Sequence, residues 1–206
     1  MHGNVKNDAI VKVYLITGKI IDSVDVANGQ FDIKRTIQQP VIATIMIRTD
    51  TGLNPEKHPL YLHSGILKIT LDEHTRIDIG SNSLSMQYQL LWEKLKPAND
   101  LVAKYKKDLL TARQSQSSDT LTILTNISEA RKKSFNIPTE FIKNHPSSDV
   151  SLEALKMMAK GNPQISSASE RYNELFLLFN SLDREVRETS GGTMYLEFLK
   201  KFKNEL

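Results

Sequence analysis

The chain has 206 residues, of which 39% are hydrophobic and 25% are charged, and its formal net charge at pH 7 is +3. These values are typical of a folded globular protein and exclude a disordered chain, and so small a net charge indicates no nucleic-acid partner. The sequence has no cysteine, which excludes disulfides, thiolate metal sites and thiol catalysis by this chain.

No segment is long and apolar enough to cross a membrane, so we predict no membrane span. The N-terminal residues 1–13, MHGNVKNDAIVKV, lack the apolar core of a signal peptide. This indicates either a cytoplasmic protein or a fragment expressed without its targeting segment.

Strand patterns fill the first 80 residues. Apolar residues alternate with polar ones in IVKVYL (10–15) and in GILKITLDE (65–73). PVIATIMIR (40–48) is apolar at most positions, which is typical of a central strand covered on both faces. The residues expected to share core-facing strand positions are Val11, Val13, Leu15, Leu67, Ile69, Leu71, Ile77 and Ile79.

The segment IIDSVDVANGQFDIKR (20–35) predicts a β-hairpin. Asn28 and Gly29 accept the positive φ angles of a tight two-residue turn, and apolar and polar residues alternate after it. Together with the other short strands, this hairpin predicts an antiparallel β-sandwich or barrel of about seven strands over residues 1–81.

The period of the apolar pattern changes from two to about 3.6 after SNS (81–83), which predicts a helical bundle over residues 82–206. SASE (167–170) has the residues of a capping box at the start of one helix. The whole chain is therefore predicted to be α+β, with a β module at 1–81 and a helical module at 82–206 that packs on it. The helical stripes that we expect to be buried contain Tyr88, Leu91, Trp92, Leu95, Val150, Leu152, Leu155, Met158, Tyr172, Leu175, Phe176, Phe179 and Leu182.

Prolines and glycines predict the ends of these helices. Pro97 lacks a backbone N–H and is expected to interrupt or kink the first helix. Pro138 is expected near the start of a later helix and Pro146 beyond its end. Gly161-Asn162-Pro163 is expected to end the next helix, and Gly191-Gly192 to break the chain before the last one.

Side chains that could carry chemistry form no recognisable site in the sequence. The five histidines lack the helical spacing of a metal site, and we expect them at surface or turn positions. Asp22 is weighed as a general base, but an acid in a strand is more typical of an edge or a turn, and Asp72-Glu73 is expected in a hairpin loop. The histidines are His2, His58, His63, His74 and His145.

Other segments are weighed as binding sites but favour a structural role. SGGT (190–193) lacks the preceding strand and the lysine of a phosphate loop, which favours a helix break. RKK (131–133) and KKFK (200–203) are expected on solvated helix faces rather than in a nucleic-acid patch. Trp92 and the stripe from Tyr172 to Leu182 are expected in the core. We therefore predict no catalytic, cofactor-binding or metal-binding residue.

Four segments occur in an order that resembles a known family. They are VYL (13–15), IDSVDVANGQFDI (21–33), YLHSGILKITLDE (61–73) and FIKNHPSSDVSLEAL (141–155). The set is similar to an N-terminal domain of unknown function that precedes a thioredoxin-like domain in envelope thiol-disulfide oxidoreductases of Gram-negative bacteria. That thioredoxin-like domain is of the alkyl hydroperoxide reductase and thiol-specific antioxidant type. The resemblance covers about residues 9–203.

The resemblance implies a non-catalytic accessory domain of a periplasmic or cell-envelope oxidoreductase, without a cofactor. Its implied partners are a thioredoxin-like domain of the same polypeptide downstream of Leu206, a protein client, and a second copy in a homodimer. The C-x-x-C chemistry would belong to that downstream domain. Two details depart from the family pattern. His63-Ser64 precedes Gly65 where the family often has an acid, and Asn144-His145-Pro146 is one residue longer than the family's asparagine-proline pair.

Two functions outside this family implication remain open. The chain could be a stand-alone cell-envelope protein that binds a peptide or a glycan between its sheet and its helices. It could also be an enzyme that acts on a sugar through two facing carboxylates in one cleft.

Overall fold

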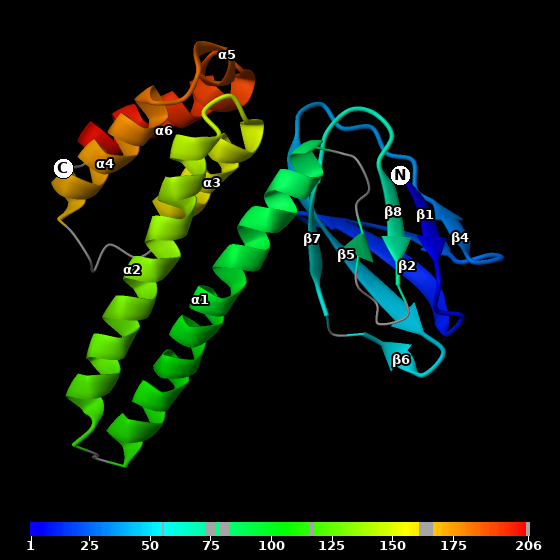
Figure 1. Ribbon diagram of the computed structural model, residues 1–206, viewed down its shortest axis with the longest axis horizontal. Coiled ribbons are helices and arrows are strands. Elements are labelled where there is room, and N and C mark those ends of the chain that lie inside the picture. Colours follow the sequence, from blue (N-terminus) through cyan, green and yellow to red (C-terminus); the bar gives the residue numbers. More distant parts are fainter. Residues whose placement is uncertain (55, 73–76, 79–82, 116–117, 161–166, 205–206) are drawn as a thin grey trace. The chain divides into compact units, whose positions relative to one another are not determined.

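The computed structural model of the chain describes residues 1–54, 56–72, 77–78, 83–115, 118–160 and 167–204. The chain divides into two compact units, Met1–Leu90 and Leu91–Leu206. Within the described residues, the first unit holds the strands and the start of helix α1, and the second holds the rest of α1 and helices α2 to α6 (Figure 1). The predicted α+β class, with strands first and helices after them, is confirmed.

The described residues form nine strands and six helices. The strands are β1 (His2–Val5), β2 (Ile10–Thr17), β3 (Ile20–Asp25), β4 (Gln30–Asp32), β5 (Val41–Thr49), β6 (Gly52–Leu53), β7 (His58–Leu62), β8 (Lys68–Leu71) and β9 (Ile77–Asp78). The helices are α1 (Ser83–Gln114), α2 (Thr120–Asn144), α3 (Asp149–Lys160), α4 (Ala168–Asn180), α5 (Arg184–Arg187) and α6 (Ser190–Asn204).

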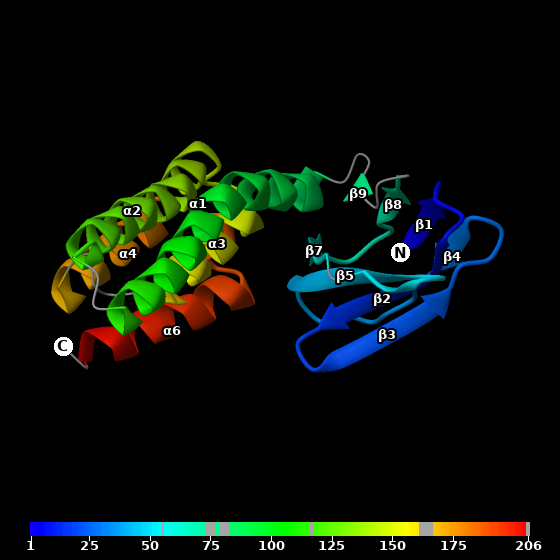
Figure 2. The same cartoon turned by 90° about the horizontal axis from the view of Figure 1, so that it is seen from below.

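The strands of the first unit form two sheets that pack face to face around one apolar core (Figure 2). One sheet has the order β4-β1-β8-β9, and the other has the order β3-β2-β5-β6 with β7 also paired to β5. This arrangement is a sandwich rather than a closed barrel. Strand β1, which the sequence patterns missed, pairs in parallel with β8, so the sandwich is not purely antiparallel as predicted.

The alternation predicted for β2 is interrupted by a β-bulge. Val13 and Leu15 are buried as expected, but Val11 is 40% exposed and Ile10 is buried in its place. The register of β2 against β5 shifts between Ile10 and Lys12. Because a bulge inserts one extra residue, it moves the next side chain to the other face of the sheet.

The predicted turn at Asn28-Gly29 is confirmed, but the hairpin around it is not. Asn28 and Gly29 have φ angles of 52° and 68°, and Ala27 and Gln30 exchange two backbone hydrogen bonds of 3.0 Å across the turn. Beyond that bridge the strands separate, because β3 pairs with β2 in one sheet and β4 pairs with β1 in the other. The segment 20–35 therefore carries the chain from one sheet to the other.

Strand β5 is central in its sheet, as predicted, but only one of its faces is fully buried. Ala43, Ile45 and Ile47 lie in the sandwich core. Ile42 and Met46, on the opposite face, are half-buried. A two-layer sandwich covers only the inner face of each sheet, which explains the difference.

Two prolines lie inside continuous helices. Pro97 is within α1 and Pro138 is within α2, so the predicted interruption at Pro97 and the predicted helix start near Pro138 are wrong. An interior proline costs a helix about 3 kcal/mol, and packing has to offset that cost. Pro138 and Ala98 are both buried. Pro146 lies beyond the end of α2, as predicted.

The remaining helix boundaries follow local signals in part. The capping box is confirmed, because Ser167 Oγ accepts from the Glu170 N–H and the Glu170 carboxylate accepts from the Ser167 N–H. Gly191 and Gly192 lie in the first turn of α6, so the predicted break there is wrong. Ile79 and the Gly161-Asn162-Pro163 signal lie outside the described residues.

We expect Gly3→Ala to destabilise the β-sandwich unit. A Cβ at Gly3 would overlap the ring of Phe31, which is buried in the core. Overpacking of this kind costs about 1–3 kcal/mol. Hydrogen exchange of the full chain should show reduced protection in β1 and β4.

Gly18→Asn is the matched control for that substitution. Gly18 has a φ of +58° and no atom within 4 Å of an added Cβ, and Asn tolerates this backbone conformation. The control should leave protection nearly unchanged. An equal loss of protection in both variants would show that the contact with Phe31 is not the cause.

Candidate binding site

A cavity of about 560 Å³ opens among helices α1 to α4 in the helical unit. Its apolar wall includes Trp92 from α1, Phe135 and Pro138 from α2, and Met157 and Met158 from α3. Cavities of roughly 300–1,000 Å³ with mostly apolar walls are typical of sites for small organic ligands. The size and wall of this cavity therefore make it the strongest candidate site in the described part of the chain.

The charged residues that line the cavity are mainly basic. Lys106 comes from α1, Arg131 and Lys132 come from α2, and Arg171 comes from α4. Glu174 is the single carboxylate among the described residues that line the cavity. This described lining has four cations and one acid, which favours an anionic ligand over a cationic one.

Arg171 is the most buried of these cations, with 8% of its surface exposed. Its Nη2 donates to the carbonyl oxygen of Met158 at 3.1 Å and to that of Ala159. These carbonyls belong to the last turn of α3, where a cation complements the helix dipole. Arg171 thereby ties α4 to the C-terminal end of α3.

Two acids on α4 have shifted pKa values of opposite sign. Burial raises the pKa of Glu174, and the nearby Lys143 partly opposes the increase. Hydrogen bonds from Ser167 lower the pKa of Glu170. The ionised form of Glu174 is therefore destabilised by burial beside the cavity, whereas Glu170 stabilises the start of α4.

The candidate acid Asp22 is engaged in an ion pair. Its Oδ2 accepts from Arg35 Nη1 at 2.6 Å. Strand β3 lies at the edge of its sheet, as predicted for a lone acid in a strand. Asp72 follows β8, and Glu73 lies outside the described residues.

The histidines lie apart in the structure. His2 contacts Asp32, and the His145 ring stacks on Phe141 with 4.3 Å between ring centres. His58 is half-buried in β7 rather than in a surface turn; burial lowers its pKa, and its Nε2 has no hydrogen-bond partner among the described residues. His63 follows β7, and His74 lies outside the described residues.

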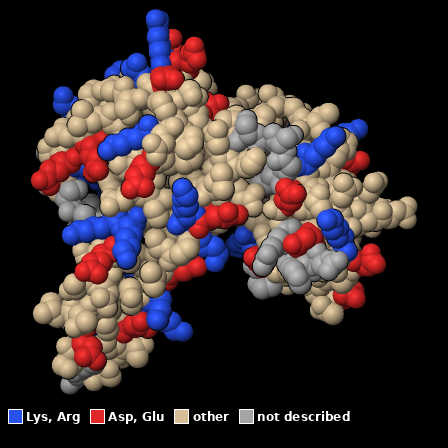
Figure 3. Space-filling model, in the orientation of Figure 1, with Lys and Arg blue, Asp and Glu red and all other residues tan. Residues whose placement is uncertain are grey.

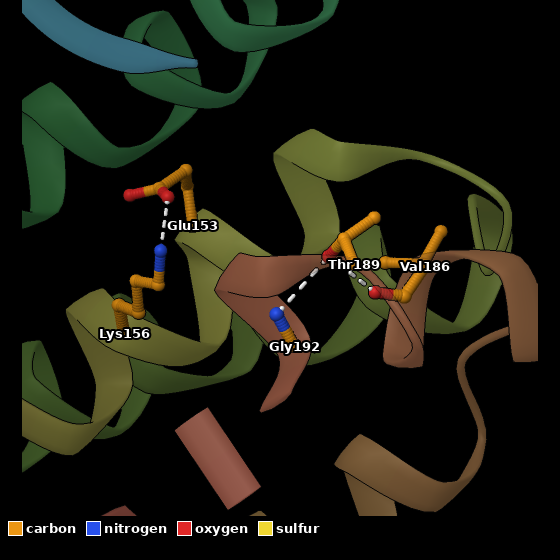
Figure 4. Close-up of polar contacts among 5 residues, drawn as sticks. All are labelled: Glu153, Lys156, Val186, Thr189 and Gly192. Carbon is orange, nitrogen blue, oxygen red and sulfur yellow. Dashed lines mark hydrogen bonds and ion pairs between the residues drawn. The ribbon is translucent and has the colours of Figure 1, made fainter. Parts of the chain in front are cut away.

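The SGGT segment, weighed as a phosphate loop, forms the first turn of α6, and Figure 4 shows the polar contacts of its Gly192. Thr189 Oγ1 accepts from the Gly192 N–H at 3.0 Å, as an N-cap side chain does, and donates to the Val186 carbonyl at 2.7 Å. Glu153 and Lys156 form an ion pair of 2.6 Å on α3. The backbone donor of Gly192 is thus already used within the protein.

The basic segments lie on helices with mixed charge. Lys200 pairs with Glu197 at 2.7 Å, and Lys203 Nζ lies 5.9 Å from the centre of the Tyr172 ring. Lys132, in the RKK segment, is exposed and lines the cavity. On the face shown in Figure 3, basic and acidic side chains are interspersed.

The aromatic residues divide between core and cavity. Leu175, Phe179 and Leu182 of the predicted stripe are buried, which confirms the core interpretation for them. Trp92 is only half-buried and lines the cavity, so it is not a core residue as expected. Arg171 was missed, although it lies four residues before Leu175 on the same apolar stripe, where a charged residue is unusual.

Within the described ranges, no group of three or more histidine, aspartate or glutamate residues could hold a metal ion. None of the helices described there has the combined length and apolar character that a membrane crossing requires.

Residues 1–91 match the family model of a domain of unknown function (DUF4369). The match covers the β-sandwich unit, which ends at Leu90, and residues 92–206 lie outside it. The chain matches no curated protein and no solved structure. The resemblance to a domain of unknown function is therefore confirmed for the first unit, and the association with a thioredoxin-like domain stays a prediction.

We expect Glu174→Gln and Glu170→Gln to shift the pH dependence of stability in opposite directions. The raised pKa of Glu174 means that stability falls as the pH rises through that pKa, because the folded state keeps a proton that the unfolded chain releases. The lowered pKa of Glu170 means that its stabilising contribution is present above its unfolded pKa and is lost as the pH falls.

Relative to the unmodified chain, Glu174→Gln should raise the melting temperature at about pH 7 and Glu170→Gln should lower it, with both differences shrinking toward about pH 3. Thermal unfolding followed by circular dichroism across that range measures both effects. Shifts of the same sign in the two variants would contradict the assignment.

Gly192→Ala is expected to destabilise the helical unit by about 1–3 kcal/mol. A Cβ at Gly192 would lie 2.6 Å from the Val186 carbonyl oxygen and would also overlap the Arg187 carbonyl. At Gly191 the nearest atom is a flexible Leu152 methyl carbon at 3.1 Å, so Gly191→Ala is the milder control. Urea denaturation followed by Trp92 fluorescence should show a larger loss of unfolding free energy for Gly192→Ala than for Gly191→Ala.

Proposed function

We propose that this chain is a non-catalytic accessory module of a thioredoxin-like thiol-disulfide oxidoreductase in the periplasm or cell envelope. In this role it positions the redox domain, or it forms the contact with a client or with a second copy. The observation that carries the proposal is that a chain without cysteine begins with a match to a domain of unknown function. Three of the four ordered motifs, those between residues 13 and 73, lie within the matched residues.

The candidate cavity supports a binding role better than acid–base chemistry on a sugar. Glycoside hydrolysis uses two facing carboxylates about 5–10 Å apart. Glu174 is the one carboxylate among the described residues that line this cavity, and the other lining residues are cationic, apolar or neutral polar. A basic cavity with aromatic walls is suited to holding an anionic group, and this favours a module that contacts a client.

A stand-alone binding protein for a peptide or a glycan is the second candidate function. The observation that favours it is the 560 Å³ cavity with Trp92 and Phe135 in its wall. Binding to the folded state raises the melting temperature in a saturable manner. A thermal-shift screen of peptide and glycan pools against the full chain tests this candidate, and the lack of a shift with every pool would count against it.

We expect the natural gene to encode a thioredoxin-like segment with a C-x-x-C motif immediately after Leu206. We also expect the chain alone to show no turnover in an insulin-disulfide reduction assay, because thiol-disulfide exchange requires a thiolate and this chain has none. A natural gene that ends at Leu206, or measurable turnover by the purified chain, would contradict the proposal.

A further inference from the structure

We propose that the cavity among α1, α2, α3 and α4 binds a small organic anion that carries a carboxylate on an apolar body, and that Arg171 receives the carboxylate. The inference rests on the proposed binding role of the module and names the chemistry of what it binds. It does not depend on the thioredoxin-like partner.

The first observation is that Arg171 is a buried cation in the cavity wall. A guanidinium has five N–H donors, and removing it from water without partners is costly. Arg171 is 8% exposed, and its Nη2 donates hydrogen bonds to the Met158 and Ala159 carbonyl oxygens. Both of these hydrogen bonds use Nη2, and Arg171 also lines the cavity. The guanidinium therefore places a buried positive charge in the cavity wall, where an anionic group can pair with it.

The second observation is the charge of the cavity mouth. Lys106 on α1 and Lys132 on α2 are exposed and line the same cavity as Arg171. They come from two different helices, so both α1 and α2 contribute positive charge to the cavity lining. Cations around a low-dielectric cleft concentrate anions and speed their entry.

The third observation is the apolar wall, which selects the body of the ligand. Trp92, Phe135 and Met158 offer two aromatic rings and a thioether, and the indole N–H of Trp92 is the one strong hydrogen-bond donor among these three side chains. A fully solvated inorganic anion gains nothing from such a wall, whereas an acyl chain or an aromatic side chain buries apolar surface against it. The combination favours a fatty acid or the free C-terminus of a short apolar peptide.

Trp92 supplies the readout, because it is the single tryptophan of the chain and lines the cavity. We would titrate the full chain with octanoate and with octan-1-ol, which share an apolar body and differ in charge. A second arm compares N-acetyl-leucyl-phenylalanine with its C-terminal amide. A charge-assisted hydrogen bond corresponds to about tenfold or more in affinity, so each acid should bind at least about tenfold more tightly than its neutral partner. If octanoate binds more tightly, the carboxylate comes from a fatty acid, and if N-acetyl-leucyl-phenylalanine binds more tightly, it comes from a peptide C-terminus.

Charge variants make the assignment specific to the cavity. The double variant Lys106→Gln/Lys132→Gln should weaken binding of the acid and leave binding of the neutral analogue unchanged. Glu174→Gln removes the one carboxylate among the described lining residues and should strengthen binding of the acid. Lys200→Gln/Lys201→Gln changes the net charge by the same amount on α6, outside the cavity lining, and is the matched control.

Arg171→Lys keeps the charge but replaces the planar fork, and it should weaken acid binding most. This variant also loses contacts to α3, so its folding must be checked by circular dichroism. If it does not fold, the lysine variants and Glu174→Gln still decide the question, since they lie at exposed or half-buried positions.

The inference is overturned if each acid and its neutral partner change Trp92 fluorescence equally, or if none of the four ligands gives a saturable change. It is also overturned if the control double variant weakens binding as much as Lys106→Gln/Lys132→Gln does. A gene without a downstream redox segment would instead contradict the proposed accessory role and leave these binding results intact.

Discussion

The helical unit is organised around a buried cation. Arg171 is removed from water on α4 and is compensated by carbonyl oxygens at the C-terminal end of α3. Those carbonyls need donors because a helix cannot satisfy its own last turn. The contact therefore compensates both the buried guanidinium and the free carbonyls of the last turn of α3, and it fixes the position of α4 against α3. Arg171 also lines the cavity, so the same residue takes part in the packing of the unit and in its candidate binding site.

The β-sandwich unit depends on a different constraint, which is how the chain passes between two sheets. The Asn28-Gly29 turn lies between β3, which pairs in one sheet, and β4, which pairs in the other. The Gly29 carbonyl accepts a hydrogen bond from the Val5 N–H at 2.7 Å. This bond ties the crossing point to β1. The Asp22–Arg35 ion pair joins the two ends of the crossing segment. An acid that could have been catalytic thus has a structural partner.

The family match and the candidate site lie in different units. The matched residues 1–91 contain the β-sandwich and the first residues of α1. The described residues that line the cavity all lie between Trp92 and Glu174. The family match therefore concerns the sandwich unit and not the residues of the cavity. The proposed anion site is a property of the helical unit, and its chemistry is argued from the residues there alone.

Local signals in the sequence determined much of the secondary structure. Alternation placed Leu67, Ile69 and Leu71 in the core, and helical spacing did the same for Leu152 and Leu155. These signals depend only on neighbouring residues, which is why they can be read without a fold. The capping box at Ser167 and the turn at Asn28-Gly29 were correct for the same reason.

The candidate site could be predicted only in fragments. The pattern around Trp92 predicts a core position, and the Arg131–Lys133 segment predicts a solvated helix face. Arg171, a charged residue on an apolar helical stripe, is the signal in the sequence that indicates a special environment at this place. A cavity is made by side chains from four helices, and no window of the sequence contains all of them.

The sequence by itself determined the class of the fold, the absence of thiol chemistry and the local signals that begin strands, turns and helices. Only the tertiary structure decided that β3 and β4 belong to different sheets, that α1 and α2 continue through Pro97 and Pro138, and that Arg171 shares a cavity with Lys106 and Lys132. The physical reason is that pairing, packing and burial join residues far apart in the chain, and these long-range contacts override local preferences of about 1–3 kcal/mol.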